Sequence, residues 1–201
     1  MKYFVSGIGT EVGKTIISAI LAEALKADYW KPIQAGDLEQ SDSIKVRDLL
    51  SNQSTQIHPE SYQLKLPMSP HAAAEKEQVV IELSAMPLPN TSRPLIVEGA
   101  GGLLVPINKK EFIIDLVDSL KLEVILVSKH YLGSINHTLL SIEALEARSI
   151  PIKGIIFNGQ PNHDTESIIL SKSGLKMIAR IPTMKSVNKQ SIKALANKIE
   201  L

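Results

Sequence analysis

The sequence predicts a doubly wound α/β fold, in which a mostly parallel sheet carries helices on both faces. Short apolar runs recur along the chain, and segments with helical spacing of apolar residues separate them. Runs that are apolar at nearly every position are typical of parallel strands, because helices cover both of their faces. Strands and helices that alternate in this way favour one layered sheet with right-handed crossovers.

Four apolar runs are expected to form the central strands, at residues 3–6, 94–99, 123–128 and 153–159. Four segments with apolar residues at helical spacing are predicted helices, at residues 15–27, 111–121, 134–148 and 186–199. The apolar stripe of the second helix consists of Phe112, Ile113, Leu116, Val117 and Leu120. Between residues 52 and 94, repeated prolines predict a loop-rich excursion around a short helix at residues 71–78.

The 201 residues are expected to form one domain, residues 1–201, since domains average on the order of 150 residues. The longest stretch without a charged side chain, residues 130–142, is shorter than the roughly 18 residues of a membrane-spanning helix. The N-terminal apolar run is too brief for a signal peptide, which predicts a cytoplasmic protein. A net charge of +1 and 4% aromatic residues argue against nucleic-acid and membrane partners. A small-molecule partner is therefore expected.

The strongest functional signal is the stretch SGIGTEVGKT, residues 6–15, between a predicted strand and a predicted helix. Glycines let backbone N–H groups turn toward a phosphate, and the N-terminus of the following helix adds positive charge. In such a loop Lys14 would reach the β- and γ-phosphates of a nucleotide, and the Thr15 hydroxyl would bind Mg²⁺. The stretch departs from the G-x-x-x-x-G-K-[ST] pattern, because Ile8 stands where the pattern has glycine. A glycine-rich turn that only caps the helix is the alternative.

Two carboxylates are candidates for a Mg²⁺ site, since this ion prefers hard oxygen ligands beside the phosphates. Glu98 follows the buried run 95–97 and precedes several glycines, which places it at the carboxyl end of a strand, where ligands bind in α/β sheets. Asp42 is the second candidate. Alternatively, Glu98 only meets solvent at a strand end, and Ser41 or Asp42 only caps a helix that runs to Leu50.

Lys31 is a candidate cation for the same site. It follows Tyr29 and Trp30 in a predicted second strand, which Pro32 ends. A cation at the carboxyl end of a strand could neutralise the charge that develops on a transferred phosphoryl group. An ordinary surface lysine is the alternative. Trp30 is expected to pack in the core rather than bind a ligand.

Six stretches stand in order along the chain: GTEVGKT at 9–15, KPIQAG at 31–36, SD at 41–42, SPH at 69–71, VEGAGG at 97–102 and LGSINH at 132–137. Together they resemble the dethiobiotin synthetase family. The resemblance implies a homodimeric ligase of biotin synthesis that depends on ATP and Mg²⁺. Such an enzyme carboxylates 7,8-diaminononanoate with CO2 and closes the ureido ring, through a carbamate and a carbamic-phosphoric anhydride.

Residue by residue, the resemblance implies the following roles. The catalytic residues would be Lys14, Lys31, Thr10 and Glu11. The nucleotide would be bound by Gly9, Thr10, Glu11, Val12, Gly13, Lys14, Thr15, Ile16, Glu98, Gly101, Asn158, Ile181 and Pro182. The metal ligands would be Thr15, Asp42 and Glu98. The substrate would be bound by Lys31, Ala35, Gly133, Ser134, Ile135 and Asn136.

In this family the far carboxylate of the substrate is held by the neighbouring subunit, at a helix N-terminus that matches residues 133–136. Free N–H groups and the helix dipole suit an anion there, although Ser134 could instead only cap the helix within a dimer surface. Asn158 matches the position that recognises adenine, with an Asn–Gly turn as the alternative. Ala35 departs from the Ser or Thr that relatives commonly carry, which implies that one hydrogen bond to the substrate is missing.

Two other functions share parts of this pattern. A dimeric nucleotide switch of the partitioning or septum-placement kind has a similar loop and fold. Such switches usually carry a lysine near the start of the loop, where this chain has residues 7–9, and the KPIQ stretch is foreign to them. A related amide-forming synthetase of cobalamin synthesis normally adds a glutaminase domain, for which 201 residues leave no room. The synthetase interpretation is therefore preferred.

Overall fold

The computed structural model describes residues 1–201 and contains a seven-stranded sheet. Its strands are β1 (Lys2–Gly7), β2 (Asp28–Trp30), β4 (Ile57–His58), β6 (Leu95–Gly102), β7 (Glu123–Lys129), β8 (Ile152–Asn158) and β9 (Met177–Ile181). They lie in the order β4-β2-β6-β1-β7-β8-β9, and every neighbouring pair is parallel. A small second sheet pairs β3 (Ile33–Ala35) with β5 (Tyr62–Leu64), also in parallel.

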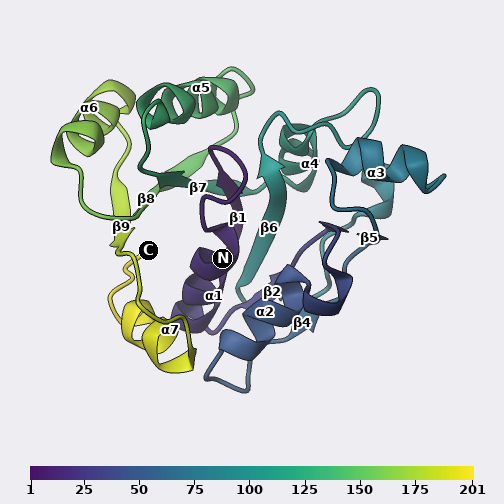
Figure 1. Ribbon diagram of the computed structural model, residues 1–201, viewed down its shortest axis with the longest axis horizontal. Coiled ribbons are helices and arrows are strands. Elements are labelled where there is room, and N and C mark those ends of the chain that lie inside the picture. Colours follow the sequence, from purple (N-terminus) through teal and green to yellow (C-terminus); the bar gives the residue numbers. More distant parts are fainter.

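Helices cover both faces of the large sheet (Figure 1). One face carries α1 (Lys14–Leu25), α2 (Asp42–Leu49) and α7 (Lys189–Ala196), which contact one another. The other face carries α4 (Ile113–Leu120), α5 (Ser134–Glu146) and α6 (His163–Ser173). Helix α3 (Pro70–Lys76) stands beside β5, and two short 3-10 helices are η1 (Leu38–Gln40) and η2 (Leu83–Ala85). The predicted fold class is therefore confirmed.

The eight elements expected from apolar patterning are all present, with shifts at their ends. The helix expected at 111–121 begins at Ile113, because the Asp115 carboxylate accepts the N–H of Phe112 at 2.8 Å and closes its first turn. The helix expected at 186–199 begins at Lys189, because Asn188 caps it by accepting from the N–H of Ser191 at 3.0 Å. No helix of the structure is long and apolar enough to cross a membrane.

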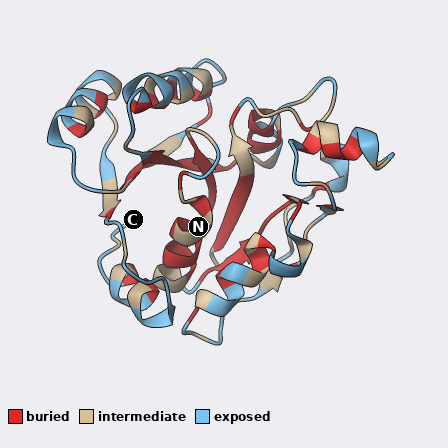
Figure 2. Ribbon diagram, in the orientation of Figure 1, coloured by how far each residue is buried: buried red, intermediate tan, exposed pale blue.

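Alternation along the strands sends neighbouring residues into opposite core layers. Tyr3 and Val5 of β1 pack on the side of α1 and α7, together with Ile96 of β6. Phe4 of β1 and Val97 of β6 pack on the side of α4. The central strands are consequently buried along their length, as the red ribbons of Figure 2 show.

A buried ion cluster ties the last strands of the sheet together. Glu166 of α6 is 3% exposed and accepts from the Arg180 Nε of β9 at 2.9 and 3.1 Å. His130, which follows β7, contacts the same carboxylate with Nε2 at 2.9 Å and stacks on Phe157 of β8. Hydrogen bonds from Arg180 lower the pKa of Glu166 from its ordinary 4.5 to about 2, outweighing its burial. One carboxylate therefore fixes α6 against the ends of β7 and β9.

The substitution Glu166→Gln is expected to lower the free energy of unfolding at pH 7 by about 2–3 kcal/mol. Because the pKa of Glu166 in the folded protein lies below its ordinary value, the carboxylate stabilises the fold above about pH 4.5, and this contribution is lost as the pH falls toward 2. Urea denaturation of both proteins from pH 7 to pH 3 should show the difference shrinking. Glu146→Gln, on the exposed surface of α5, is the control. A difference that stays constant with pH would contradict the assignment.

Candidate active site

The glycine-rich loop joins β1 to α1 at the centre of the sheet, where β6 and β7 flank β1. Gly13 precedes α1 in the left-handed conformation, with φ of 95°, and no side chain caps the helix. The N–H groups at the start of α1 are therefore free of side-chain partners, as the binding of a phosphate requires. A Cβ atom at Gly13 would lie 2.3 Å from Nδ2 of Asn158, so this position needs glycine.

Asn158 fixes the shape of this loop from β8. Its Nδ2 donates to the carbonyl of Val12 at 2.8 Å, and the side chain of Val12 is buried. Lys14 turns back over the same loop, where its Nζ donates to the carbonyl of Gly9 at 3.1 Å. Burial lowers the pKa of Lys14, although the nearby Glu98 opposes this change. An amine thus stands directly over the loop, where the phosphates of a nucleotide would lie.

Lys31, directly after β2, and Glu98 bring a buried ionic cluster to the edge of the loop. The strand β6 runs on to Gly102, so Glu98 lies within it and not at its end, where the sequence had predicted it. Glu98 is 1% exposed, and both of its oxygens have partners. Its Oε1 accepts from the hydroxyl of Thr15 at 2.9 Å and from Nζ of Lys31 at 3.3 Å, and its Oε2 accepts from the phenol of Tyr29 at 2.9 Å. Lys31 also pairs with Asp42. A single ammonium group therefore bridges two carboxylates.

The charges of this cluster stabilise one another. Burial disfavours the ammonium of Lys31, but attraction by Glu98 and Asp42 outweighs burial and raises the pKa of Lys31. Burial also opposes ionisation of Asp42, and the charge of Lys31 outweighs it and lowers the pKa of Asp42. Burial, reinforced by the charge of Glu98, raises the pKa of Tyr29 well above its ordinary value. At neutral pH Lys31 is a cation and Tyr29 is a neutral hydrogen-bond donor.

The donor set of this cluster suits Mg²⁺. The hydroxyl of Thr15 and the carboxylates of Asp42 and Glu98 are hard oxygen ligands. The ammonium of Lys31 lies between the two carboxylates, so this place already holds one positive charge. No group of three or more His, Cys, Asp or Glu residues in the structure could hold a metal. An ion bound here therefore needs further oxygen ligands from phosphates or water, which is the usual situation of Mg²⁺ in nucleotide sites.

A cavity of about 790 Å³ joins the loop to the ionic cluster. The predicted site residues that line it are Thr10, Glu11, Gly13, Lys14, Thr15, Ile16, Lys31, Ala35, Asp42, Glu98 and Gly101. Gly9 lines neighbouring hollows with Ile8 and Thr10. Residues from the glycine-rich loop, α1, β3, α2 and β6 thus converge on one space, although Thr10 and Gly101 lie about 90 positions apart in the chain.

Other predicted site residues lie outside this cavity. Residues 133–136 form the N-terminus of α5, and Ser134 is the first helical residue rather than its cap, since Gly133 holds that position at φ of 102°. The side chain of Ile181 is buried in the core at the end of β9, while Pro182 is exposed. Ser41, not Asp42, caps α2 by accepting from the N–H of Ile44 at 3.3 Å. The carboxylate of Asp42 is consequently free for the ionic cluster.

Sequence reasoning missed three polar residues of the site. Tyr29 was noted only as part of a strand, yet it holds Glu98. Gln34 accepts from the N–H of Asp42 at 3.2 Å, and Lys45 lies 3.7 Å from the carboxylate of Asp42. The sequence could have indicated two of these residues. Tyr29 lies on the same strand face as Lys31, and Lys45 follows Asp42 at the spacing of one helical turn. Gln34 carried no such signal.

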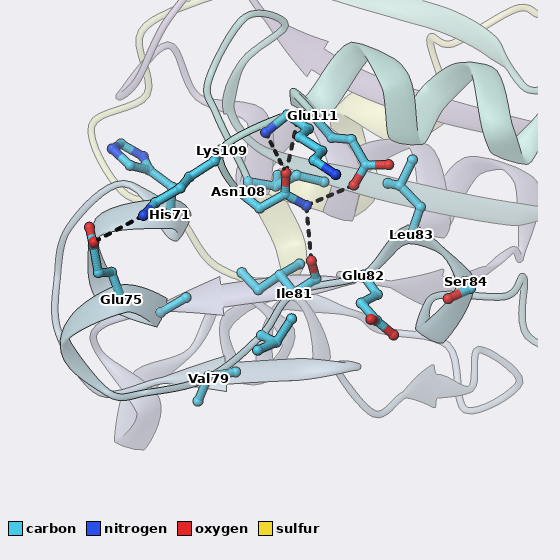
Figure 3. A pocket seen from close by; sticks show the side chains of 14 residues that line it. His71, Glu75, Val79, Ile81, Glu82, Leu83, Ser84, Asn108, Lys109 and Glu111 are labelled. Atoms are coloured by element: carbon cyan, nitrogen blue, oxygen red, sulfur yellow. Dashed lines mark hydrogen bonds and ion pairs between the residues drawn. The ribbon is translucent and has the colours of Figure 1, made fainter.

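A second cavity, of about 750 Å³, lies away from the glycine loop (Figure 3). It is formed by α3, the segment around Ile81 and the turn at residues 107–111. Asn108 Nδ2 donates to the carbonyl of Ile81 at 2.9 Å, and Lys109 lies 3.7 Å from Glu75 (Figure 3). None of the predicted site residues lines this cavity, and it has no glycine-rich phosphate loop. The predicted site residues therefore gather at the first cavity and not at the second.

The loop, the uncapped helix N-terminus, Lys14 and the carboxylate on a neighbouring strand define a P-loop nucleotide-binding protein. A family model described as an AAA domain matches residues 1–191. The fold also matches that of the septum site-determining protein MinD complexed with Mg-ADP from Pyrococcus horikoshii, with a TM-score of 0.60 over 98% of this chain and 96% of that one. At 14% sequence identity this likeness shows the fold alone.

The chain is 54% identical to the ATP-dependent dethiobiotin synthetase BioD of Christiangramia forsetii, over 98% of this chain and 95% of that protein. It is 50% identical to the protein of the same name from Cytophaga hutchinsonii, over 98% and 96% of the two chains. The chain belongs to the dethiobiotin synthetase family, whose members are ATP-dependent ligases. The resemblance found in the sequence motifs is therefore confirmed.

Two glycines of the loop, Gly9 and Gly13, should differ sharply in their tolerance of alanine. Gly13→Ala adds a methyl group in a left-handed conformation against Asn158, so we expect the free energy of unfolding to fall by about 1–3 kcal/mol. At Gly9 a Cβ atom would meet nothing within 4 Å, and Gly9→Ala should change stability by less than about 1 kcal/mol. Urea denaturation without nucleotide measures both values. Equal losses would contradict the geometry of the loop.

Proposed function

We propose that this chain is a dethiobiotin synthetase that uses ATP and Mg²⁺ to carboxylate 7,8-diaminononanoate with CO2 and to close the ureido ring, in biotin biosynthesis. The observation that carries the proposal is the ionic cluster of Thr15, Lys31, Asp42 and Glu98, which shares one cavity with the glycine-rich loop. The names of the relatives support the same reaction. A nucleotide switch has no evident use for Lys31 and the cavity beside it.

The proposed chemistry needs no protein nucleophile. One amine of the substrate takes up CO2 as a carbamate and releases a proton, and ATP then phosphorylates a carbamate oxygen with release of ADP. The second amine attacks the carbonyl carbon of this mixed anhydride, the C–O bond to the phosphoryl group breaks, and phosphate leaves together with a proton from the attacking nitrogen. Each step builds or moves negative charge. Catalysis therefore rests on holding the reactants together and on neutralising that charge.

The two buried lysines would supply the positive charge. The Nζ of Lys14, now bonded to the Gly9 carbonyl, would turn to the phosphate oxygens of ATP. Lys31 lies between the loop and the end of β3, so its ammonium would stabilise the carbamate and the transferred phosphoryl group. When bound, Mg²⁺ supplies further positive charge at the phosphates, held by Thr15, Asp42 and Glu98.

Residues on and near the rim of the cavity would position the diamine, the phosphates and the base of ATP. Thr10 and Glu11 lie at the exposed tip of the loop, where they would contact the diamine and the phosphates. Glu11 holds an uncommon positive φ of 57°, and Lys129 donates to its carbonyl at 3.3 Å. The base of ATP would lie beside Asn158, Ile181 and Pro182 at the ends of β8 and β9. Asn158 already uses its Nδ2 on Val12, which leaves its Oδ1 for the exocyclic amine of adenine.

A homodimer would complete the substrate site. Residues 133–136 lie outside the cavity of their own chain, so they would hold the far carboxylate of a substrate bound to the partner subunit. Exposed apolar side chains near this helix end support a subunit contact: Leu104, Tyr131, Leu132 and Leu140. One synthetase domain over residues 1–201, located in the cytoplasm, belongs to the same proposal.

The test supplies the purified protein with ATP, Mg²⁺, bicarbonate and the diamine, and measures phosphate release together with the mass of the product. We expect phosphate release that depends on the diamine and matches the dethiobiotin formed. Lys14→Ala should reduce kcat at least 10²-fold, because the phosphates lose their buried cation. Exposed Lys172→Ala is the control and should leave turnover unchanged. Diamine-independent ATP hydrolysis without ring closure would reject the proposal in favour of a nucleotide switch.

Ala35 gives a gain-of-affinity prediction. It lines the cavity at the end of β3, at a position where the family resemblance implies a hydroxyl. Ala35→Ser should add one hydrogen bond to the substrate, on the order of 1 kcal/mol, and lower the KM of the diamine up to about fivefold. The KM of ATP should stay unchanged and serves as the internal control. An increase in the KM of the diamine would place the substrate elsewhere.

A further inference from the structure

Tyr29 makes a contact that none of the proposed roles uses. Its side chain is completely buried, and its hydroxyl donates to Oε2 of Glu98 at 2.9 Å. This phenol is the only hydrogen-bond donor to Oε2 in the structure. The other oxygen, Oε1, faces the cavity through Thr15 and Lys31. The two oxygens of Glu98 thus have different environments: Oε2 is held in the core by the phenol, and Oε1 lies beside the cavity.

The register of the sheet produces this arrangement. Tyr29 of β2 pairs with Ile96 of β6 in parallel, and both side chains pack in the same core layer. Glu98 stands two residues after Ile96, and Lys31 stands two residues after Tyr29, so alternation points both toward this layer. The phenol reaches diagonally along the sheet to Glu98, and the ammonium of Lys31 meets the same carboxylate at the strand end.

The hydroxyl of Tyr29 is not needed to fill the core. A phenylalanine ring would occupy the same apolar space among its neighbours in the core layer. The hydroxyl satisfies a carboxylate oxygen that is otherwise buried without a donor, a costly situation for an anion. Tyr3 lies in the same core layer and has no hydrogen bond to Glu98. Removing the hydroxyl of Tyr3 therefore tests the effect on packing alone, and removing that of Tyr29 also tests the hydrogen bond to Glu98.

We propose that Tyr29 is a positioning residue for the metal site: its phenol fixes Oε2 of Glu98 and thereby directs Oε1 to the divalent ion. This inference rests on the proposed function, which requires that ion beside Thr15 and Asp42. A carboxylate with one restrained oxygen loses the rotation that would otherwise oppose metal binding. Residues that orient a metal ligand in this way typically change metal affinity 10–100-fold when they are removed.

The test compares wild type, Tyr29→Phe and Tyr3→Phe in their binding of a non-hydrolysable ATP analogue. Affinity is measured in EDTA and again with Mn²⁺, and thermal unfolding reports on the fold. In wild type Mn²⁺ should increase the affinity for the analogue. We expect Tyr29→Phe to reduce this metal-dependent gain about tenfold and to leave binding in EDTA within about twofold of wild type. Tyr3→Phe should leave both affinities unchanged. If loss of a buried hydroxyl acted through packing alone, this variant would also lose affinity.

An undiminished metal-dependent gain in Tyr29→Phe would overturn the inference while leaving the proposed function intact. An equal loss in Tyr3→Phe would overturn it as well, because the effect would then come from packing. Absence of any metal-dependent gain in wild type would instead reject the proposed function and the inference with it. A crystal structure of wild type with the analogue and Mn²⁺ needs no variant. It should show the phenol bonded to Oε2 and the ion at Oε1, and an ion at Oε2 would overturn the inference.

Discussion

The site depends on the contact of the Lys31 ammonium with the carboxylates of Asp42 and Glu98. Each of these charges would be expensive to bury alone, and together they offset the loss of water. The contact joins the end of β2 to the middle of β6 and to the first turn of α2. It thereby closes one wall of the cavity and favours the ionised form of Asp42 beside the loop that would receive a triphosphate.

The sheet brings these groups together because its strand order differs from the order of the chain. β1 lies between β6 and β7, and β2 lies on the far side of β6. Loops that leave neighbouring strands in opposite directions open a crevice at this point, which is where α/β proteins bind their ligands. The glycine loop, Lys31 and Glu98 therefore meet without any special local structure beyond the loop itself. Their proximity follows from parallel pairing and from the alternation of side chains.

Much of this arrangement could be predicted from the sequence, and the failures have physical causes. Nearly continuous apolar runs such as 123–128 and the loop between 6 and 15 are governed by local patterns, so their structures could be predicted from the residues. β9 and α6 were missed, because Met177–Ile181 contains Arg180 and the exposed face of α6 hides its few apolar contacts. β4 and β5 are two- and three-residue strands within a proline-rich segment, and only their partners define them. Tyr29 was predicted only as part of a strand, because a single sequence does not reveal the partner of a buried hydroxyl.

The contact between Asn158 and Val12 also bears on the thermodynamics of association. A long glycine-containing loop would ordinarily sample many shapes, and a ligand that selects one of them loses part of its affinity to that ordering. Here an amide from β8 already restrains the loop, and Gly13 accepts the left-handed turn without strain. The loop therefore loses its conformational entropy when the chain folds, and not when the nucleotide binds. Such preorganisation favours rapid capture with little rearrangement of the backbone.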